Sequence, residues 1–599
     1  MENSLLYPCN NRYRDSRLLD GLWQFQFDPT AKGKAQHWEK GLPQPLKVPV
    51  PGSFSELFTK EQQRDYVGDF WYETNFFVPR GWEQTTLWVR FGSLTQRATV
   101  YCNGVELTTH EGGFLPVIAA LSSVIRLNQE NKLVVQLNNE LNETSLPCGT
   151  QKILPSGRKI AKPYFDFFNY AGIQRSVWLL SLPQVAIQDY SVTFQREEEN
   201  ALVNFDVQTT DSNSVQVRLL DAQGKLVAAA HGKQGTLRVP HAHWWQVRNA
   251  YLYQIVIQLK TETGEILDEY SDRIGIRTVE ISGTKILLNG KPIYLKGFGK
   301  HEDFAILGKT FNWSVAKRDF ELMKWSNANC FRTSHYPYAE EWYQFADEEG
   351  FLIIDEVPAV GMMRSTHNYV AAGSGKYTHF FETPTVPQLK ANHLQQINEM
   401  IVRDKNHPSV IAWSLFNEPE TTSAYAKEYF TEIFTKARQY DPQKRPLTGA
   451  LEKNSQPDKC QCFPLLDFIC LNRYYGWYIS GGADIEEAEQ LFQQEMEKWK
   501  ALNLNVPIVF TEFGADTLPS EHKLPSSMWS QEYQCKYLKM NFHVFDNYDF
   551  VQGELVWCFA DFQTAEAIMR VNGNRKGVFT RERQPKDAAF MLKQRWETK

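Results

Sequence analysis

The chain has 599 residues, of which 42% are hydrophobic and 22% charged, and its formal net charge at pH 7 is −6. This length predicts two to four domains, one of which can be a barrel of roughly 250 residues. An ordinary globular composition without a surplus of basic residues argues against nucleic acid as a partner. We expect no membrane partner either, because no stretch approaches about 18 consecutive apolar residues.

The N-terminal residues and the cysteines predict a cytoplasmic protein. Residues 1–23 lack a basic segment followed by an apolar one, which is the pattern of a secretory signal peptide. The nine cysteines are scattered, and only Cys460 and Cys462 lie close together. Their spacing lacks the second pair that a structural zinc site uses. We therefore expect free, buried thiols and no metal site.

Two all-β domains are predicted before the middle of the chain. Residues 1–181 contain alternating runs such as DFWYETNFFVP at 69–79 and NKLVVQLNNEL at 131–141, which predict a jelly-roll-like β-sandwich. Residues 182–275 contain further runs, among them ALVNFDVQTT at 201–210, whose spacing is typical of an immunoglobulin-like β-sandwich. We expect both sandwiches to act as scaffold.

From residue 276 to residue 599, apolar strands alternate with segments of helical length, which is the signature of parallel βα units. Eight such strands are predicted, and eight parallel strands close into a (β/α)₈ TIM barrel. The strands are PIYLKGFG at 292–299, ANCFRTSH at 328–335, FLIIDEVP at 351–358, SVIAWSLFNEP at 409–419, PLTGAL at 446–451, DFICLNRYY at 467–475, VPIVFTEFG at 506–514 and VQGELVWCFADF at 551–562. Because catalytic groups of this fold lie where strands end, polar residues that directly follow an apolar run carry most weight.

Two glutamates meet this criterion on opposite sides of the predicted barrel. The fourth strand ends in Asn417-Glu418-Pro419, and the seventh ends in Glu512. Hydrolysis of an acetal needs one group that protonates the leaving oxygen and a second that captures the oxocarbenium-like carbon, and two carboxyls about 5 Å apart do this with retention of configuration. An isolated Asn-Glu-Pro tripeptide is most often a surface feature. Two glutamates on the fourth and seventh of eight strands instead favour a retaining glycosidase.

The two glutamates need different ionisation states at neutral pH. We expect partial burial and a neighbouring negative charge to raise the pKa of Glu418, the acid/base. We expect Glu512, the nucleophile, to be ionised. Hydrogen bonds from Tyr474 or Arg332 would hold it as a carboxylate.

With these motifs the chain resembles glycoside hydrolase family 2, and within it the bacterial β-glucuronidases. RDKNHPSVIAWSLFNEP at 403–419 is similar to the family signature that ends in the acid/base glutamate, and VFTEFGAD at 509–516 is similar to the segment that carries the nucleophile. Other similar segments are GFGKHED at 297–303, FRTSHYPYAEE at 331–341, LNRYYGWY at 471–478, GNRKGVFTR at 573–581 and, in the first sandwich, DFFNYAGI at 166–173. The resemblance therefore spans the whole barrel.

The resemblance implies a role for each residue of the site. Glu418 is expected to be the acid/base, Glu512 the nucleophile and Asn417 a neighbour of the sugar's 2-hydroxyl. The pocket for the sugar ring is expected to be lined by Asp166, His335, Tyr474, Tyr478, Trp557 and Arg570.

Asn574 and Lys576 form an N-x-K motif that meets the C6 carboxylate of the sugar in β-glucuronidases. An ammonium beside an amide donor binds a carboxylate with charge-assisted hydrogen bonds, whereas a neutral sugar would leave the lysine unpaired. From composition alone, Lys576 belongs to a solvated run of basic residues. The resemblance reverses that interpretation.

The implied reaction is hydrolysis of small-molecule β-glucuronides by a homotetramer, with no cofactor and no metal. Residues 361–387 form an unusually long connection after the third strand, which predicts a wall for apolar, drug-like or steroid-like aglycones. Cys558 departs from the family pattern, because Asn is expected after Trp557.

Other activities stay open at this point. A β-galacturonidase, β-galactosidase or β-mannosidase could share the same domain plan, and galacturonide differs from glucuronide only at C4. Asn574 and Lys576 count against the neutral sugars. A non-catalytic carbohydrate-binding protein is the alternative from another class, and the two glutamates at strand ends count against it.

Overall fold

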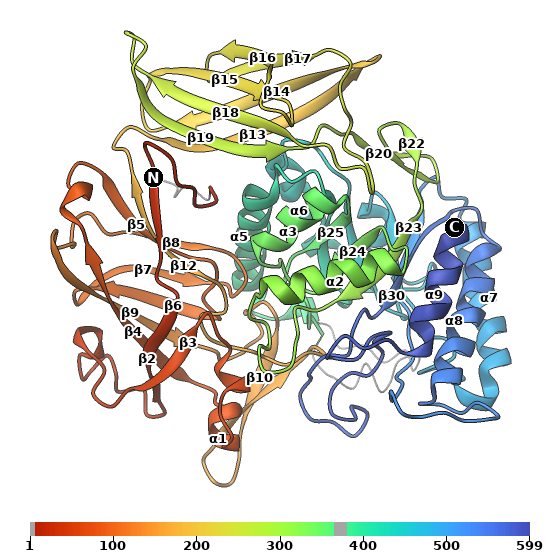
Figure 1. Cartoon of the computed structure of the whole chain (residues 1–599). Coiled ribbons are helices and arrows are strands. Elements are labelled where there is room, and N and C mark those ends of the chain that lie inside the picture. The colour runs from red at the N-terminus through yellow and green to blue at the C-terminus, as the bar shows by residue number, and fades with distance from the viewer. Residues whose placement is uncertain (1–5, 364–379) are drawn as a thin grey trace.

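The computed structural model describes residues 6–363 and 380–599, which form two β-sandwiches packed against one barrel (Figure 1). Salt bridges fasten both sandwiches to the barrel. Arg90 of the first sandwich pairs with Glu340 at 2.7 Å, and Asp189 of the second pairs with Lys405 at 2.6 Å. Most of the long connection predicted at 361–387 lies outside the described residues, because these omit 364–379.

The first sandwich pairs a six-stranded antiparallel sheet, in the order β3-β2-β4-β9-β6-β7, with a four-stranded one, in the order β1-β12-β5-β8. One buried hydrophobic cluster contains side chains of both sheets, including Phe25 and Val89. The strands are β1 (Asp15–Leu18), β2 (Gly21–Asp28), β3 (Leu46–Val50), β4 (Asp69–Val78), β5 (Thr86–Phe91), β6 (Arg97–Cys102), β7 (Val105–Glu111), β8 (Val117–Ala120), β9 (Gln129–Asn138) and β12 (Val177–Leu182), with a separate hairpin of β10 (Gly149–Ile153) and β11 (Lys159–Pro163) and the short helix α1 (Glu61–Arg64).

The second sandwich has a three-stranded sheet, β13-β14-β17, and a four-stranded sheet, β16-β15-β18-β19. Buried and less buried residues alternate along β14, as expected for a strand with one face on a core. Its strands are β13 (Ile187–Glu197), β14 (Asn200–Thr209), β15 (Ser214–Leu220), β16 (Leu226–His231), β17 (Gln234–Val239), β18 (Tyr253–Lys260) and β19 (Ile266–Ile274). A small sheet of β20 (Val279–Ser282), β21 (Lys285–Leu288) and β22 (Lys291–Pro292) leads into the barrel.

The eight predicted parallel strands close into a barrel, which confirms the expected fold. They are β23 (Leu295–Lys300), β24 (Cys330–Thr333), β25 (Leu352–Glu356), β26 (Val410–Asn417), β27 (Leu447–Leu451), β28 (Ile469–Asn472), β29 (Ile508–Glu512) and β30 (Val551–Trp557). Every residue of β26 is buried, because the barrel interior covers one face of the strand and helices cover the other.

Helices follow seven of the eight barrel strands. They are α2 (Trp313–Trp325), α3 (Glu340–Glu349), α5 (Val386–Asp404), α6 (Ala424–Tyr440), α7 (Ile485–Ala501), α8 (Gln531–Asp546) and α9 (Asp587–Thr598). The connection after β27 holds only the 3₁₀ helix η5 (Phe463–Leu465), so the alternation of strand and helix is broken there.

The cysteines and the hydropathy of the helices were also the subject of predictions. All nine cysteines are free, and seven of them are buried, as predicted. Within residues 6–363 and 380–599, no helix combines the length and the apolar character that crossing a bilayer would need.

Candidate active site

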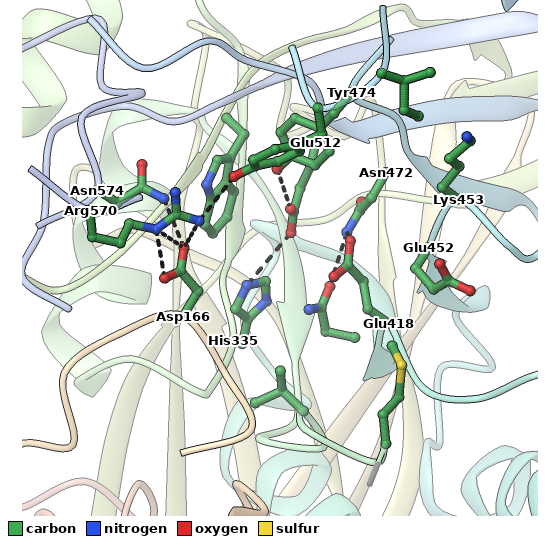
Figure 2. A pocket seen from close by; sticks show the side chains of 16 residues that line it. Asp166, His335, Glu418, Glu452, Lys453, Asn472, Tyr474, Glu512, Arg570 and Asn574 are labelled. Carbon is green, nitrogen blue, oxygen red and sulfur yellow. Dashed lines mark hydrogen bonds and ion pairs between the residues drawn. The ribbon is translucent and has the colours of Figure 1, made fainter. Parts of the chain in front are cut away.

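A pocket at the carboxyl ends of the barrel strands gathers side chains from the barrel and from the first sandwich (Figure 2). Ten of the predicted residues line it: Asp166, His335, Asn417, Glu418, Tyr474, Tyr478, Glu512, Trp557, Arg570 and Asn574. Lys576 does not line the pocket directly. Its ammonium donates to the hydroxyl of Tyr478, and Tyr478 is one of the lining residues. The lining that the sequence did not predict consists of Val360, Met363, Glu452, Lys453, Asn472 and Ile479.

Glu512 is the last residue of β29, and two donors hold its carboxylate. Arg332 Nη1 donates to Oε1 at 3.0 Å, and the Tyr474 hydroxyl donates to Oε2 at 2.7 Å, as predicted. Burial nevertheless raises the pKa of Glu512 to about 8; Arg332 acts to lower it, and the charge of Glu418 acts to raise it. Burial thus opposes the ionised state that was expected for Glu512, whereas the two donors favour it.

Glu418 follows β26 with a left-handed backbone, φ 49°. A non-glycine residue in this region costs about 1–3 kcal/mol and persists only when its surroundings fix it, as they do at many functional sites. The Glu418 N–H donates to the carbonyl of Ala450 at 2.9 Å, which ties this turn to β27. Asn472 Nδ2 donates to Glu418 Oε1 at 2.9 Å. The backbone and the side chain of Glu418 are therefore both held in place.

A buried charge network connects the two glutamate-bearing strands. Arg332, which is fully buried, donates through Nε to Glu356 at 2.7 Å and through Nη2 to Asn417 Oδ1 at 2.6 Å, besides its bond to Glu512. His335 Nδ1 lies 2.7 Å from Glu356 Oε1. Although burial acts to raise it, Arg332 and His335 hold the pKa of Glu356 below its ordinary value. One guanidinium thus positions both Asn417 and Glu512.

An aromatic wall stands beside Glu512. The rings of His335 and Trp557 stack with their centroids 5.1 Å apart and an interplanar angle of 17°. Burial lowers the pKa of His335 to about 4, so its imidazole is neutral at neutral pH. The wall therefore offers a flat, uncharged surface to a sugar ring.

The first sandwich contributes directly to the pocket through Asp166, which lies between β11 and β12. Arg570 Nε donates to both carboxylate oxygens of Asp166 at 2.9 Å, and Asn574 Nδ2 donates to Oδ2 at 3.0 Å. Arg570 Nη2 also donates to the Tyr478 hydroxyl at 2.9 Å. Figure 2 shows Asp166, Arg570 and Asn574 together at one end of the pocket.

Lys576 is buried, with 1% of its surface exposed, so the interpretation as a solvated basic run was wrong. Its ammonium pairs with Asp516 and donates to the Tyr478 hydroxyl at 2.8 Å. Asp516 Oδ2 also lies 3.8 Å from Arg570 Nη1. Two cations, Arg570 and Lys576, therefore face two carboxylates, Asp166 and Asp516, at this end of the pocket.

Sequence reasoning missed two polar residues that it had the means to find. Glu452 directly follows β27 and Asn472 ends β28, so both meet the strand-end criterion that selected Glu418 and Glu512. The apolar lining, by contrast, carries no signal in the sequence. Cys558, whose contacts were in doubt, is buried, and its thiol lies 3.2 Å from the carbonyl of Ala560.

Only one group of three side chains in the described ranges has the spacing of metal ligands: His522, Glu532 and Asp587. None of the three lines the pocket.

Comparisons with known proteins agree with this architecture. Three family models match consecutive parts of the chain: the sugar binding domain of glycosyl hydrolases family 2 at 16–183, glycosyl hydrolases family 2 at 185–277, and the TIM barrel domain of that family at 279–599. A β-glucuronidase of Paenibacillus borealis is 41% identical over 99% of this chain and 98% of its own. The Homo sapiens β-glucuronidase is 38% identical over 100% of this chain and 93% of its own.

Solved structures give the same result. The β-glucuronidase of Ruminococcus gnavus in complex with uronic isofagomine is 66% identical, covers 100% of both chains and superposes with a TM-score of 0.99. The same enzyme in complex with D-glucaro 1,5-lactone is 64% identical over 100% of both chains, with a TM-score of 0.96.

Proposed function

The chain belongs to glycosyl hydrolase family 2, and from this premise we infer that it is a β-glucuronidase, which releases D-glucuronate and an aglycone from β-D-glucuronides. The observation that carries the inference is the content of one pocket. Two glutamates at strand ends lie there beside a corner that holds buried cations. The first feature suits acetal hydrolysis, and the second suits a sugar with a carboxylate.

We propose that hydrolysis proceeds by double displacement with retention of configuration. In the first step Glu418 protonates the glycosidic oxygen while the Glu512 carboxylate attacks the anomeric carbon, and the aglycone leaves. In the second step Glu418 removes a proton from the water that hydrolyses the glycosyl-enzyme ester. The bonds from Arg332 and Tyr474 support this role for Glu512, because they orient its carboxylate before the sugar binds.

Recognition of the uronate is assigned to the corner around Asp166. We propose that the C6 carboxylate binds Asn574 and Lys576, whose side chains both lie at this corner, where Asn574 donates to Asp166 and Lys576 donates to the Tyr478 hydroxyl. Arg570 and Lys576 pair with Asp166 and Asp516, so an incoming carboxylate replaces existing partners of these cations. His335, Trp557 and the remaining predicted residues, Asn417, Tyr474 and Tyr478, would contact the ring.

A panel of p-nitrophenyl glycosides tests the substrate. We expect the β-D-glucuronide to be hydrolysed with a kcat/KM at least about 10³-fold above the galactoside and the mannoside, since a neutral sugar has no carboxylate for charge-assisted hydrogen bonds with Asn574 and Lys576. The galacturonide tests recognition at C4. Equal turnover of a neutral glycoside would contradict the assignment, and a lack of turnover of every glycoside would favour a carbohydrate-binding protein.

The pH profile tests the carboxyl pair. Because burial and Glu418 raise the pKa of Glu512 to about 8, the interacting pair holds one proton at neutral pH. The active form needs that proton on Glu418 and none on Glu512. We therefore expect kcat/KM for the glucuronide to fall as pH rises through about 8, where the pair loses its proton. Measurements over roughly pH 5 to 10 check this, and undiminished activity at the alkaline end would contradict it.

We also propose a homotetramer in the cytoplasm, with domains at 1–181, 182–275 and 276–599. Nine free cysteines suit a reducing compartment. Family matches at 16–183, 185–277 and 279–599 support the division into domains. Light scattering after size-exclusion chromatography tests the tetramer, and fractionation of the producing cells tests the location.

A further inference from the structure

The pocket continues past Glu418 on the side away from the uronate corner. In Figure 2, Asp166, Arg570 and Asn574 lie at one end, Glu512 and Glu418 lie in the middle, and Glu452 and Lys453 lie at the other end. An acid that protonates the glycosidic oxygen stands between the sugar and the leaving group. If the proposed function holds, Glu452 and Lys453 therefore belong to the aglycone side of the site.

One carboxyl oxygen of Glu452, on this side of the pocket, lacks a hydrogen-bond partner among the described residues. Only 8% of the residue is exposed. Its Oε2 accepts from the N–H of Asn454 at 2.7 Å, whereas its Oε1 is buried and has no hydrogen-bond partner among the residues that the structure describes. A buried polar atom without a partner is unfavourable and calls for an explanation. A ligand group that completes the bond supplies one.

The surroundings of Glu452 define the complementary ligand. Val360, Met363 and Ile479 give the pocket apolar walls, which suit the body of an aromatic or aliphatic aglycone. When Glu452 is ionised, its oxygen without a partner can only accept a hydrogen bond, so the matching group on the aglycone is a donor. Burial, together with the charge of Glu418, raises the pKa of Glu452 to about 7. A donor on the ligand would favour the ionised, stronger acceptor.

We propose that Glu452 selects aglycones that carry a hydroxyl or ammonium donor on an apolar body. The role is one of specificity, and it leaves the chemistry to Glu418 and Glu512. Because the glycosyl-enzyme intermediate no longer contains the aglycone, the selection acts in the first step only. It should therefore appear in kcat/KM and be absent from a kcat that is limited by hydrolysis of the intermediate.

Matched pairs of substrates test this role. Hydroxymethylphenyl and methylphenyl β-D-glucuronides, in the meta and the para series, release phenols of similar acidity and differ in one donor. We expect the wild-type protein to favour the hydroxymethyl member of at least one pair by about tenfold in kcat/KM. Glu452→Leu should abolish the preference, and Glu452→Gln, which keeps an acceptor and the bond from Asn454, should retain part of it. Glu262→Gln, on the exposed surface of the second sandwich, is the matched control and should keep the full preference.

The outcomes separate direct selection by Glu452 from an indirect effect through Glu418. An active wild-type protein without any preference, or a Glu452→Leu variant that keeps the preference, would overturn the proposal. So would equal losses on both members of a pair together with a shifted pH profile, because Glu452 would then act only through Glu418. A wild-type protein that hydrolyses no glucuronide at all would instead overturn the proposed function.

Discussion

Replacing Glu512 by alanine should lower kcat for p-nitrophenyl β-D-glucuronide on the order of 10⁵-fold, because no group remains that can form the covalent intermediate. Replacing Glu418 by alanine should lower kcat about 10²–10⁴-fold. The loss should be smaller for substrates whose leaving group needs no protonation. Steady-state rates on p-nitrophenyl and phenyl glucuronides measure both effects. Equal losses on the two substrates in the Glu418→Ala variant would contradict its assignment as the acid.

Azide distinguishes the two roles by the stereochemistry of the product. In Glu512→Ala, azide can occupy the space of the lost carboxylate and attack the opposite face of the sugar, so the expected product is the α-glucuronosyl azide. In Glu418→Ala the intermediate still forms from an activated substrate, and azide attacks it to give the β-azide. Proton NMR of the products identifies each anomer. The same anomer from both variants would rule out the double displacement with these two residues.

Loss of activity in the Glu512 variants should not come from unfolding. The pKa of Glu512 is raised by burial, so above the pKa of the unfolded chain folding requires uptake of a proton, and this opposes folding increasingly as pH rises towards about 8. Glu512→Gln removes the titrating group while Arg332 keeps its pair with Glu356. The melting temperature of this variant at neutral pH should therefore be no lower than that of the wild-type protein.

Replacing Lys576 by methionine should reduce kcat/KM for the glucuronide by about 10²–10³-fold, because a bound carboxylate loses a buried, charge-assisted partner. The same change should leave turnover of the neutral glucoside within about threefold, so that selectivity collapses. Assays of both substrates with each variant measure the ratio. A ratio that does not change would remove Lys576 from uronate recognition.

The control for Lys576 is its partner Asp516. Removing the lysine alone takes the nearer of two cations from the buried Asp516 carboxylate, and loss of one partner of a buried ion pair costs up to about 3–5 kcal/mol. The double variant Lys576→Met with Asp516→Asn removes both charges and should recover most of that stability in urea unfolding. Selectivity should not recover with it. Recovery of selectivity in the double variant would mean that Lys576 acts only by balancing Asp516.

The barrel and its two glutamates were predictable because both follow from local patterns. A buried strand is a continuous apolar run, and a polar residue at its end is visible without any knowledge of the fold, as Glu418 and Glu512 show. Asp166 was different. It joins the pocket through an ion pair with Arg570 across 404 residues of sequence, so only the resemblance to a family indicated it.

Burial and ionisation were the properties that the sequence did not reveal. Lys576 lies in a run of basic residues, yet Asp516, Tyr478 and the surrounding rings enclose it. The raised pKa of Glu512 depends on how much solvent the folded pocket excludes, which no local pattern encodes. Glu452 was overlooked for a different reason: it meets the strand-end criterion, but none of the segments that carry the family resemblance includes it.

The ion pair between Asp166 and Arg570 joins two parts of the chain that are made far apart in time during synthesis. Domains generally fold as units while the chain leaves the ribosome, the N-terminal ones first. Asp166 is therefore in its finished sandwich long before Arg570, which lies 29 residues from the C-terminus of the described chain, has been made. The first sandwich is then folded and already holds Asp166, its contribution to the pocket. A nascent chain stalled anywhere between Glu512 and Arg570 would carry both proposed catalytic glutamates and still lack Arg570, Asn574 and Lys576, so we expect such a chain to be inactive on glucuronides.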